Sequence, residues 1–371
     1  MEDELKHPLP NWKRVRRAVS SCKRTEFLAL LEEAKFHKRT NELKEYHRIV
    51  QNIMMIRKQN ASVQEIEDPQ EAGQVIYEPE RLRKTLSEKY RLLFESANSR
   101  PPFHVGEIQS VTQEELEECL GMISYGKGMG MDCIPDVILQ LPFPRLKNKL
   151  RQFVNAVFRD RKIPAPFDCA RLHLLNKLKS GIPGLDDLRP IMITSPLVKL
   201  VESIALTELK SKLEPAITAA QTGFISKLGT HVHILRLLGR IIDIRDSPNF
   251  KGGNWLTFFI DFKSAFDKVD HQILFKKLQE SGITQRTINI LKLLYNSYHF
   301  SLMEGEPSKI NSGVAQGSLV SPLLYDWYVN DLVSHLSKTL GVEHTFAYAD
   351  DIALLCLGYS DVRAALSAIE D

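Results

Sequence analysis

Three aspartates follow or interrupt apolar runs in the second half of the chain. Asp261 ends the run LTFFID, and Asp350 and Asp351 stand together inside HTFAYADDIALLCL. A single aspartate at a strand end is most often a turn former. Two adjacent carboxylates at the tip of a buried hairpin repel each other and lose hydration, unless a cation neutralises them. The pattern therefore predicts a divalent cation site at these three residues.

Magnesium fits such a site, because it takes one or two carboxylates and keeps its other positions for water and phosphate oxygens. Three carboxylates from two neighbouring strands can hold two ions about 3.5–4 Å apart, an arrangement that assists in-line displacement at phosphorus. The chemistry indicated by these residue types is thus metal-assisted phosphoryl transfer.

The surrounding sequence predicts the elements that must position the aspartates. The run at 256–260 is typical of a buried strand, and 344–356 of two strands around a tight turn. Between Asp261 and Gly282, a helix is expected with Phe266, Val269, Ile273 and Leu278 near one face. A last helix should begin near residue 360.

Periodicity and capping signals place further helices upstream of the strands. A capping box at Thr112 and Glu115 opens one of them, and Ser195 with Pro196 opens another. Polar residues 60–73 are typical of a linker. We expect helices over residues 12–59 (one or two long ones), 80–94, 112–120, 146–158 and 197–213.

The composition is that of a globular protein, with 371 residues, 43% hydrophobic and 26% charged positions, and a net charge of +3. Residues 1–60 carry a net charge of +6, residues 61–130 of −6, and the remainder of +3. A basic leading segment favours a polyanionic partner, although a solvated helical surface explains it equally well. No apolar run approaches the length of a membrane span, and no signal peptide is recognised. Five widely spaced cysteines favour a reduced, intracellular protein of the nucleus or cytoplasm.

Three segments around the aspartates resemble the palm motifs of reverse transcriptases, and most resemble those of the non-LTR (LINE-type) retrotransposon enzymes. These segments are FFIDFKSAFD, GVAQGSLVSPLL and FAYADDIALL. Four upstream segments resemble further blocks of that family in the same order: YGKGMGMDCIPDVIL, LLNKLKSG, DDLRPIMITSPLVKLVE and QTGFISKLGTHVHILRLL. The resemblance covers about residues 85–365, and its specificity comes from the number and order of the motifs.

The resemblance implies a role for each residue near the aspartates. Asp261 and Asp350 would be the principal ligands of two Mg²⁺ ions, for which Mn²⁺ is a possible substitute, and Asp351 would support them. Phe262 would offer its backbone carbonyl to the second ion. Phe266 would be the aromatic steric gate against a ribose 2′-hydroxyl; without the motif, a core position on a helix is the simpler interpretation.

The resemblance also implies residues that bind the nucleotide and the nucleic acid. Lys177 and Arg189 would grip the triphosphate, although Lys177 taken alone reads equally well as a surface charge. Gln316 would orient nucleotide and template, and Gly317 would let the backbone approach the nascent pair. The primer terminus would lie over two further residues, Tyr348 and Ala349.

The fold implied by the resemblance is α+β, the right-hand polymerase fold, with an antiparallel palm sheet backed by helices and with the thumb absent from this chain. Met131 and Cys133 stand where proline and glycine are common in the family, and Ala315 where proline often precedes glutamine. The expected organisation is a basic helical extension at 1–75, fingers at 76–195 and 283–313, and palm at 196–282 and 314–371.

The implied function is RNA-directed DNA polymerisation, with an RNA template, a DNA primer and deoxynucleoside triphosphates as partners. Two alternatives remain open from the sequence. One is a retroelement remnant that binds nucleic acid without polymerising, and the other is a viral RNA-dependent RNA polymerase, which Phe266, Gln316 and Ala349 argue against. No membrane partner is expected, and the oligomeric state is not predicted. A zinc site at His231 and His233, taken as neighbours on a strand, is disfavoured because no third ligand is near.

Overall fold

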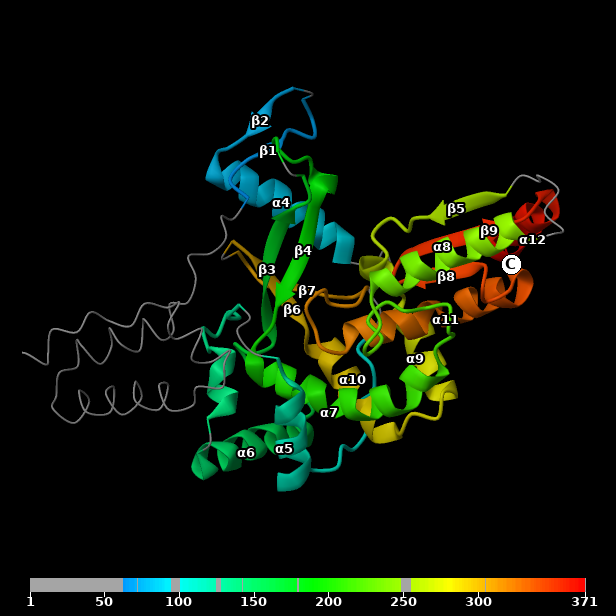
Figure 1. Cartoon of the computed structure of the whole chain (residues 1–371). Helices are drawn as coiled ribbons and strands as arrows, with labels where there is room; N and C mark the ends of the chain where they lie inside the picture. Colours follow the sequence, from blue (N-terminus) through cyan, green and yellow to red (C-terminus); the bar gives the residue numbers. More distant parts are fainter. Residues whose placement is uncertain are drawn as a thin grey trace, which may run out of the picture.

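The computed structural model describes residues 63–71, 73–94, 101–124, 128–141, 143–178, 180–247, 255–303 and 305–370. Most of the predicted basic extension at 1–75, including the helices expected over 12–59, lies outside these residues. Within them, a four-stranded sheet of order β4-β3-β6-β7 and a three-stranded sheet of order β5-β9-β8 lie on either side of a group of helices (Figure 1). In the described ranges, no helix is both long and apolar enough to cross a membrane.

The four-stranded sheet is built on β3 (Cys169–Asn176), the longest strand in the described ranges. It pairs in antiparallel fashion with β4 (Leu188–Ile193) and in parallel fashion with β6 (His299–Leu302), which pairs with β7 (Ser308–Lys309). Alternate residues of β3 are buried, as expected for a strand with one face on a core. Helix α4 (Pro79–Phe94) packs on β6 and β7 through a stripe of residues spaced four apart, Leu82, Leu86, Tyr90 and Phe94.

The linker predicted at 60–73 is wrong where the structure describes it. Strand β1 (Ile66–Glu67) pairs with β2 (Val75–Ile76), and the side chains of Ile66 and Ile76 are fully buried. A ladder of two residues has no period to detect, so a few apolar residues among polar ones gave no strand signal.

The helices predicted over 80–94, 112–120, 146–158 and 197–213 are confirmed, together with the caps at Thr112 and Ser195. The Glu115 carboxylate, expected to complete a capping box, pairs with Arg286 instead. Thr112 Oγ1 accepts a hydrogen bond from the Glu115 backbone N–H at 3.2 Å, and Ser195 Oγ accepts one from the Leu197 N–H at 3.1 Å. These bonds satisfy N–H groups that have no partner inside the helix. The helices are α5 (Gln113–Met122), α6 (Pro144–Asp160) and α7 (Pro196–Leu213), with short 3-10 turns at Asp136–Gln140, Leu185–Asp187 and Glu214–Ala216.

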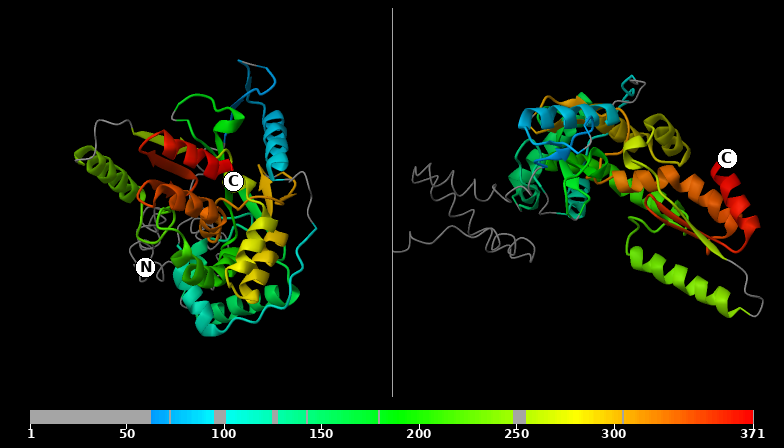
Figure 2. Two further views of the ribbon diagram at one scale, coloured as in Figure 1. Left: turned by 90° about the vertical axis from the view of Figure 1, so that its right-hand side faces the viewer. Right: turned by 90° about the horizontal axis from the view of Figure 1, so that it is seen from above.

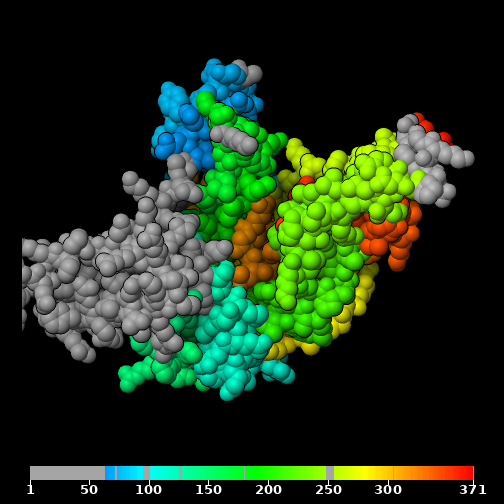
Figure 3. Space-filling view, in the orientation of Figure 1, coloured from blue at the N-terminus to red at the C-terminus, as the bar shows by residue number. Residues whose placement is uncertain are grey.

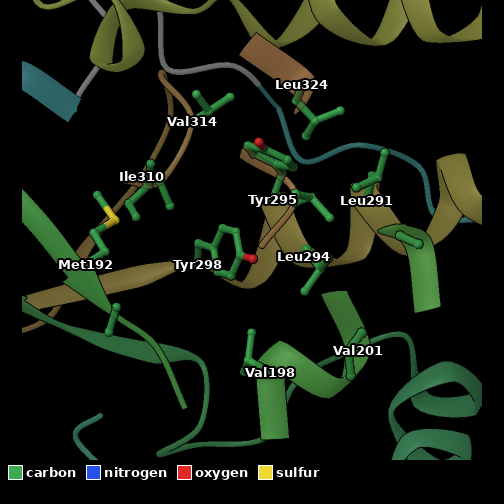
Figure 4. Packing of buried hydrophobic residues seen from close by; sticks show 14 of the residues in the cluster. Met192, Val198, Val201, Leu291, Leu294, Tyr295, Tyr298, Ile310, Val314 and Leu324 are labelled. Atoms are coloured by element: carbon green, nitrogen blue, oxygen red, sulfur yellow. The ribbon is translucent and has the colours of Figure 1, made fainter. Parts of the chain in front are cut away.

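The main core lies between α7, α10 (Gln285–Ser297) and the four-stranded sheet. Helix α7 is apolar over most of its surface because it packs against α5, α6, α10 and α11 (Ser321–Leu340). Figure 4 shows part of this core, where side chains from several elements converge: Met192, Val198, Val201, Leu291, Leu294, Tyr295, Tyr298, Ile310, Val314 and Leu324.

The three-stranded sheet carries the aspartates. Strands β8 (Thr345–Tyr348) and β9 (Asp351–Cys356) form the predicted hairpin, and β5 (Leu256–Ile260) pairs with β9. Helices α11 and α12 (Tyr359–Glu370) cover one face. Helix α8 (Thr230–Asp246) covers β8 and β9 on the other face, so the sheet is sandwiched between helices (Figure 2).

The expectation of a fully buried strand at 256–260 is wrong. β5 is an edge strand, and Phe259 is 78% exposed on the face that α8 covers only over β8 and β9. A continuous apolar run is typical of a strand covered on both faces, but the sequence does not say how far the covering helix extends.

The helix expected directly after Asp261 begins later than predicted. Residues Phe266–Lys268 form a 3-10 turn, and α9 (His271–Glu280) starts after Asp270, whose carboxylate accepts hydrogen bonds from the first turn. Phe266 and Val269 therefore precede the helix, and Ile273 is 48% exposed. The buried face is formed by His271, Leu274, Phe275 and Leu278.

Candidate functional site

The sheet register brings the three predicted carboxylates together. Ile260 at the end of β5 pairs with Ile352, so Asp261 lies beside Asp351 at the start of β9. Asp350 occupies the turn immediately before it. Asp261 and Asp351 are exposed, whereas Asp350 is half-buried.

Electrostatics at Asp350 show how close these charges are. Partial burial raises the pKa of the Asp350 carboxyl, and the charges of Asp351 and Asp261 raise it further, while the Arg189 guanidinium lowers it. A cation at this point would relieve the repulsion among the three carboxylates. Arg189, from β4 of the other sheet, is already near enough to act on Asp350.

The carboxylates fit Mg²⁺ as an open set of ligands. Among the described residues, no three His, Cys, Asp or Glu side chains are gathered closely enough to enclose a metal ion by themselves. Magnesium does not need an all-protein cage, because it keeps waters and takes substrate phosphates as ligands. Mutually repelling carboxylates at the ends of adjacent strands are donors of the right kind.

The turn that carries Asp350 has an unusual backbone. Ala349 is buried and adopts a left-handed conformation, with φ at +56°. A Cβ on Gly223 would lie 2.2 Å from the Ala349 nitrogen, so only glycine permits this approach. The Gln221 amide bonds to Ala349 from the same loop. Gln221 and Gly223 belong to the segment QTGFISKLGTHVHILRLL, within which the sequence analysis assigned neither of them a role.

Phe266 lies in the 3-10 turn that follows Asp261, among other aromatic rings. It stacks on Tyr325 with ring centroids 4.3 Å apart and an interplanar angle of 13°. The Phe224 ring meets it edge to face at 6.1 Å. The ring is thus fixed by packing, on a turn rather than on a regular helix as predicted.

Gln316 and Gly317 pack against β4 and the segment after Asp261. The Gln316 carbonyl accepts a hydrogen bond from Met192 N–H at 2.7 Å, and its side-chain amide donates to Asp267 at 3.1 Å. Burial raises the pKa of Asp267 to about 6. Gly317 has φ +124°, and a Cβ there would lie 2.2 Å from the Met192 carbonyl oxygen. In this structure, contact with β4 is the reason for the glycine; its predicted approach to a nascent pair stays a prediction.

Lys177, directly after β3, and Arg189, in β4, are both exposed, and Arg189 pairs with Leu175 of β3. Lys177 Nζ donates to the Asp186 carbonyl at 3.0 Å. The sequence missed two further lysines here, since Lys89 and Lys263 both form ion pairs with the Asp186 carboxylate, at 3.2 and 3.1 Å. The pair with Lys263 joins the loop before β4 to the loop after Asp261.

A buried carboxylate that the sequence also missed holds the segment after Gln316. Glu202 on α7 is fully buried, accepts a hydrogen bond from the Tyr298 hydroxyl, and accepts another from the Leu319 N–H at 2.8 Å. Burial raises its pKa. The signal available in the sequence was a glutamate inside the apolar run KLVESIAL.

Tyr348 ends β8 with its ring half-buried, next to a histidine of α8. The His233 ring lies edge to face with it at 6.5 Å, and His233 Nε2 is 2.7 Å from the Ala347 carbonyl oxygen. His231 and His233 thus lie on a helix, not on a strand as expected.

A hollow opens between the four-stranded sheet and α8 in the space-filling view (Figure 3), with orange atoms of the chain's later residues on its floor.

Comparison with known proteins identifies the family of this chain. The sequence profile of the family "Reverse transcriptase (RNA-dependent DNA polymerase)" matches residues 177–371. The RNA-directed DNA polymerase from mobile element jockey of Drosophila melanogaster is 25% identical over 273 residues, which are 71% of this chain and 29% of that protein.

Two further relatives come from other animals. The Pol polyprotein from the type-1 retrotransposable element R2 of Popillia japonica is 28% identical over 218 residues, 55% of this chain and 30% of its own. The transposon TX1 149 kDa protein of Xenopus laevis is 26% identical over 273 residues, 69% of this chain and 20% of its own. The chain thus spans a third or less of the length of these relatives. It belongs to the reverse transcriptase family and, within it, resembles the enzymes of non-LTR retrotransposons.

Proposed function

We propose that this chain catalyses Mg²⁺-dependent, RNA-directed DNA synthesis. The primer 3′-hydroxyl oxygen attacks the α-phosphorus of a deoxynucleoside triphosphate, and pyrophosphate leaves as the new phosphodiester bond forms. The observation that carries the proposal is the meeting of Asp261, Asp350 and Asp351 at adjacent strand ends, with Arg189 of the other sheet acting on Asp350.

Under this proposal, the two sheets correspond to fingers and palm. The four-stranded sheet with α4, α5 and α6 falls within 76–195 and 283–313, which would be fingers. The three-stranded sheet with α8, α11 and α12 falls within 196–282 and 314–371, which would be palm. RNA template and DNA primer would lie against the hollow between these two parts.

The carboxylates would hold the metal ions. Asp261 and Asp350 would be the principal ligands of two Mg²⁺, with Asp351 beside them in support and the Phe262 carbonyl as a further donor; Mn²⁺ would substitute. When bound, the ions would neutralise charge that develops on the attacking and leaving oxygens. The protein's own part is to fix the carboxylates at the ends of paired strands.

The cations of the fingers would bind the triphosphate. The Arg189 guanidinium suits two phosphate oxygens at once, and the Lys177 ammonium adds a point charge at the end of β3. Gln316 would orient the nucleotide and template strand from its bond to Asp267. Tyr348 and Ala349 would lie beneath the primer terminus.

Phe266 would select deoxyribose by excluding a 2′-hydroxyl. Its stack on Tyr325 supports this role, because a ring that cannot turn aside makes an effective steric barrier. A ring surrounded only by solvent could rotate away and make room for the 2′-hydroxyl.

One assay tests the polymerase proposal. Incorporation of dNTPs and rNTPs on a primed poly(rA) template is measured with and without Mg²⁺, for the wild type, Asp350→Ala/Asp351→Ala and the control Asp246→Ala, an exposed aspartate of α8. We expect Mg²⁺-dependent dNTP incorporation that only the double variant loses. Preferential rNTP use would favour an RNA polymerase, and intact primer-template binding without incorporation would favour a non-polymerising binder.

A second assay tests the gate. Phe266→Ala should reduce the preference for dNTPs over rNTPs, while Phe224→Ala, which removes a ring that also touches Phe266, should leave it unchanged. An unaltered preference in Phe266→Ala would contradict the assignment.

A further inference from the structure

The Gln221 side chain contacts the turn that carries Asp350, and no role has been assigned to it so far. Its side chain is 3% exposed and lies in the loop between α7 and α8. Oε1 accepts a hydrogen bond from Ala349 N–H at 2.9 Å, and Nε2 donates to the Ala349 carbonyl at 3.1 Å. One amide thus satisfies both backbone groups of the residue that precedes Asp350.

The loop around Gln221 is fixed to the outer edge of β8. Ala347 N–H donates to the Ala220 carbonyl at 2.8 Å, and Thr222 N–H donates to the Ala347 carbonyl at 2.9 Å. Gln221 and Ala347 form a parallel bridge. Gly223 N–H also donates to Gln221 Oε1, at 2.8 Å, which orients the amide before it meets Ala349.

The turn needs such a support. Ala349 has φ +56°, and a residue with a Cβ pays about 1–2 kcal/mol for the left-handed conformation. Asp350 follows directly, so the direction of its carboxylate depends on the torsions of Ala349. Relaxation of Ala349 would swing Asp350 away from Asp261 and Asp351, and mutual repulsion of the carboxylates favours that movement.

We propose that Gln221 is a positioning residue for Asp350, and that its amide holds the turn in the conformation in which the metal-binding carboxylates converge. The inference rests on the proposed function only where it concerns turnover, because the convergence of the carboxylates can be measured separately. An amide is required on chemical grounds. A carboxylate could not donate to the Ala349 carbonyl, and it would add another negative charge beside Asp350.

The chain contains a matched control for this geometry. The Asn296 amide on α10 bonds in the same way to both backbone groups of Phe103, at 2.9 and 2.8 Å. Phe103 lies in the segment before α5 and packs on Phe275. Removal of the Asn296 amide takes the same two hydrogen bonds from a loop that holds no carboxylate of the site.

The experiment compares three variants with the wild type: Gln221→Met, Gln221→Glu and Asn296→Leu. Binding of Mn²⁺ to the protein is measured by electron paramagnetic resonance at one fixed pH, the free energy of unfolding by urea titration, and kcat and KM for dNTP on the primed template. Hydrogen exchange at the Ala349 amide is followed in the metal-free protein.

We expect both Gln221 variants to weaken Mn²⁺ binding and to lower kcat about 10–100-fold, the size typical of residues that orient metal ligands. The KM for dNTP should stay within about twofold, and the Ala349 amide should exchange faster. Asn296→Leu should lower the free energy of unfolding, and it should leave Mn²⁺ binding and kcat unchanged.

Gln221→Met that resembles Asn296→Leu, losing stability alone, would overturn the proposal. If the wild type incorporates no dNTP, the proposed function fails, but Mn²⁺ binding and exchange at Ala349 still decide whether Gln221 positions Asp350. The two failures are therefore distinguishable.

Discussion

Two phenylalanines on strands of the two sheets are buried to opposite extents. In β6 of the four-stranded sheet, Phe300 is 2% exposed and packs edge to face on Phe94 of α4. In β5 of the three-stranded sheet, Phe259 is 78% exposed, although it stands two residues from Asp261. The difference shows that the part with the larger core supplies stability, while the strand that ends at the site contributes less packing.

Two buried carboxylates differ in whether they have hydrogen-bond partners. Glu202 on α7 is bonded to Tyr298 and to the backbone of Leu319. Asp326, near the start of α11, is fully buried, and neither of its oxygens has a hydrogen-bond partner in the part of the chain that the structure describes. Burial raises the pKa of Asp326 to about 8. The Glu202 carboxylate links α7 to neighbouring segments through hydrogen bonds, whereas the buried Asp326 carboxylate lowers the free energy of unfolding.

The largest expected effect concerns the two phenylalanines. Phe300→Ala should lower the free energy of unfolding by about 3–5 kcal/mol, because it removes a buried ring and leaves a cavity. Phe259→Ala, the matched control on the other sheet, should change it by less than about 0.5 kcal/mol. Urea unfolding of both variants measures the difference; similar losses would show that β5 is covered in solution.

Asp326→Asn should raise stability in a pH-dependent way. The Asp326 carboxyl ionises near pH 3.8 in the unfolded chain and near 8 in the native state, so native stability is lost as the pH rises between these values. The advantage of the variant over the wild type should grow by about 2–3 kcal/mol between pH 5 and pH 7. A constant advantage across this range would show that Asp326 has a partner.

The ion pair between Lys263 and Asp186 links the two regions, and its effect should fall on substrate binding. Both side chains are largely exposed, so Lys263→Met should change the free energy of unfolding by less than about 1 kcal/mol. Loss of a positive charge near the proposed triphosphate site should raise the KM for dNTP about fivefold, with Lys84→Met on α4 as the control. An unchanged KM would restrict the triphosphate cations to Lys177 and Arg189.

The smallest effect is expected at a strained turn between α5 and α6. Cys133 has φ +55°, a conformation that favours glycine. Cys133→Gly should raise the free energy of unfolding by about 0.5–1 kcal/mol, since relief of strain exceeds the added chain entropy. Thermal unfolding checks this; a loss would mean that the thiol contributes packing.

Local signals predicted much of this fold because they act over a few residues. The cap at Thr112, the proline at the start of α7 and the aspartate turn between β8 and β9 each follow from neighbouring side chains. The 3-10 turn at Phe266 and the β1–β2 pair were missed, since neither is long enough to show a period. The residues that hold the site, Gln221 and Glu202, were missed as well, because their partners are more than 90 positions away.

The sequence by itself predicted which residues could do chemistry. Residue type and spacing indicated the three carboxylates at strand ends, because they set which ligands and charges the chain can offer, and the resemblance to reverse transcriptases added Arg189 and Phe266. Only the tertiary structure decided that β5 is an edge strand, that Gly317 packs on β4, and that an amide from a distant loop holds Ala349. Each of these features depends on contacts between backbone segments that are distant in the sequence. Such contacts form only when the whole chain has folded and packed.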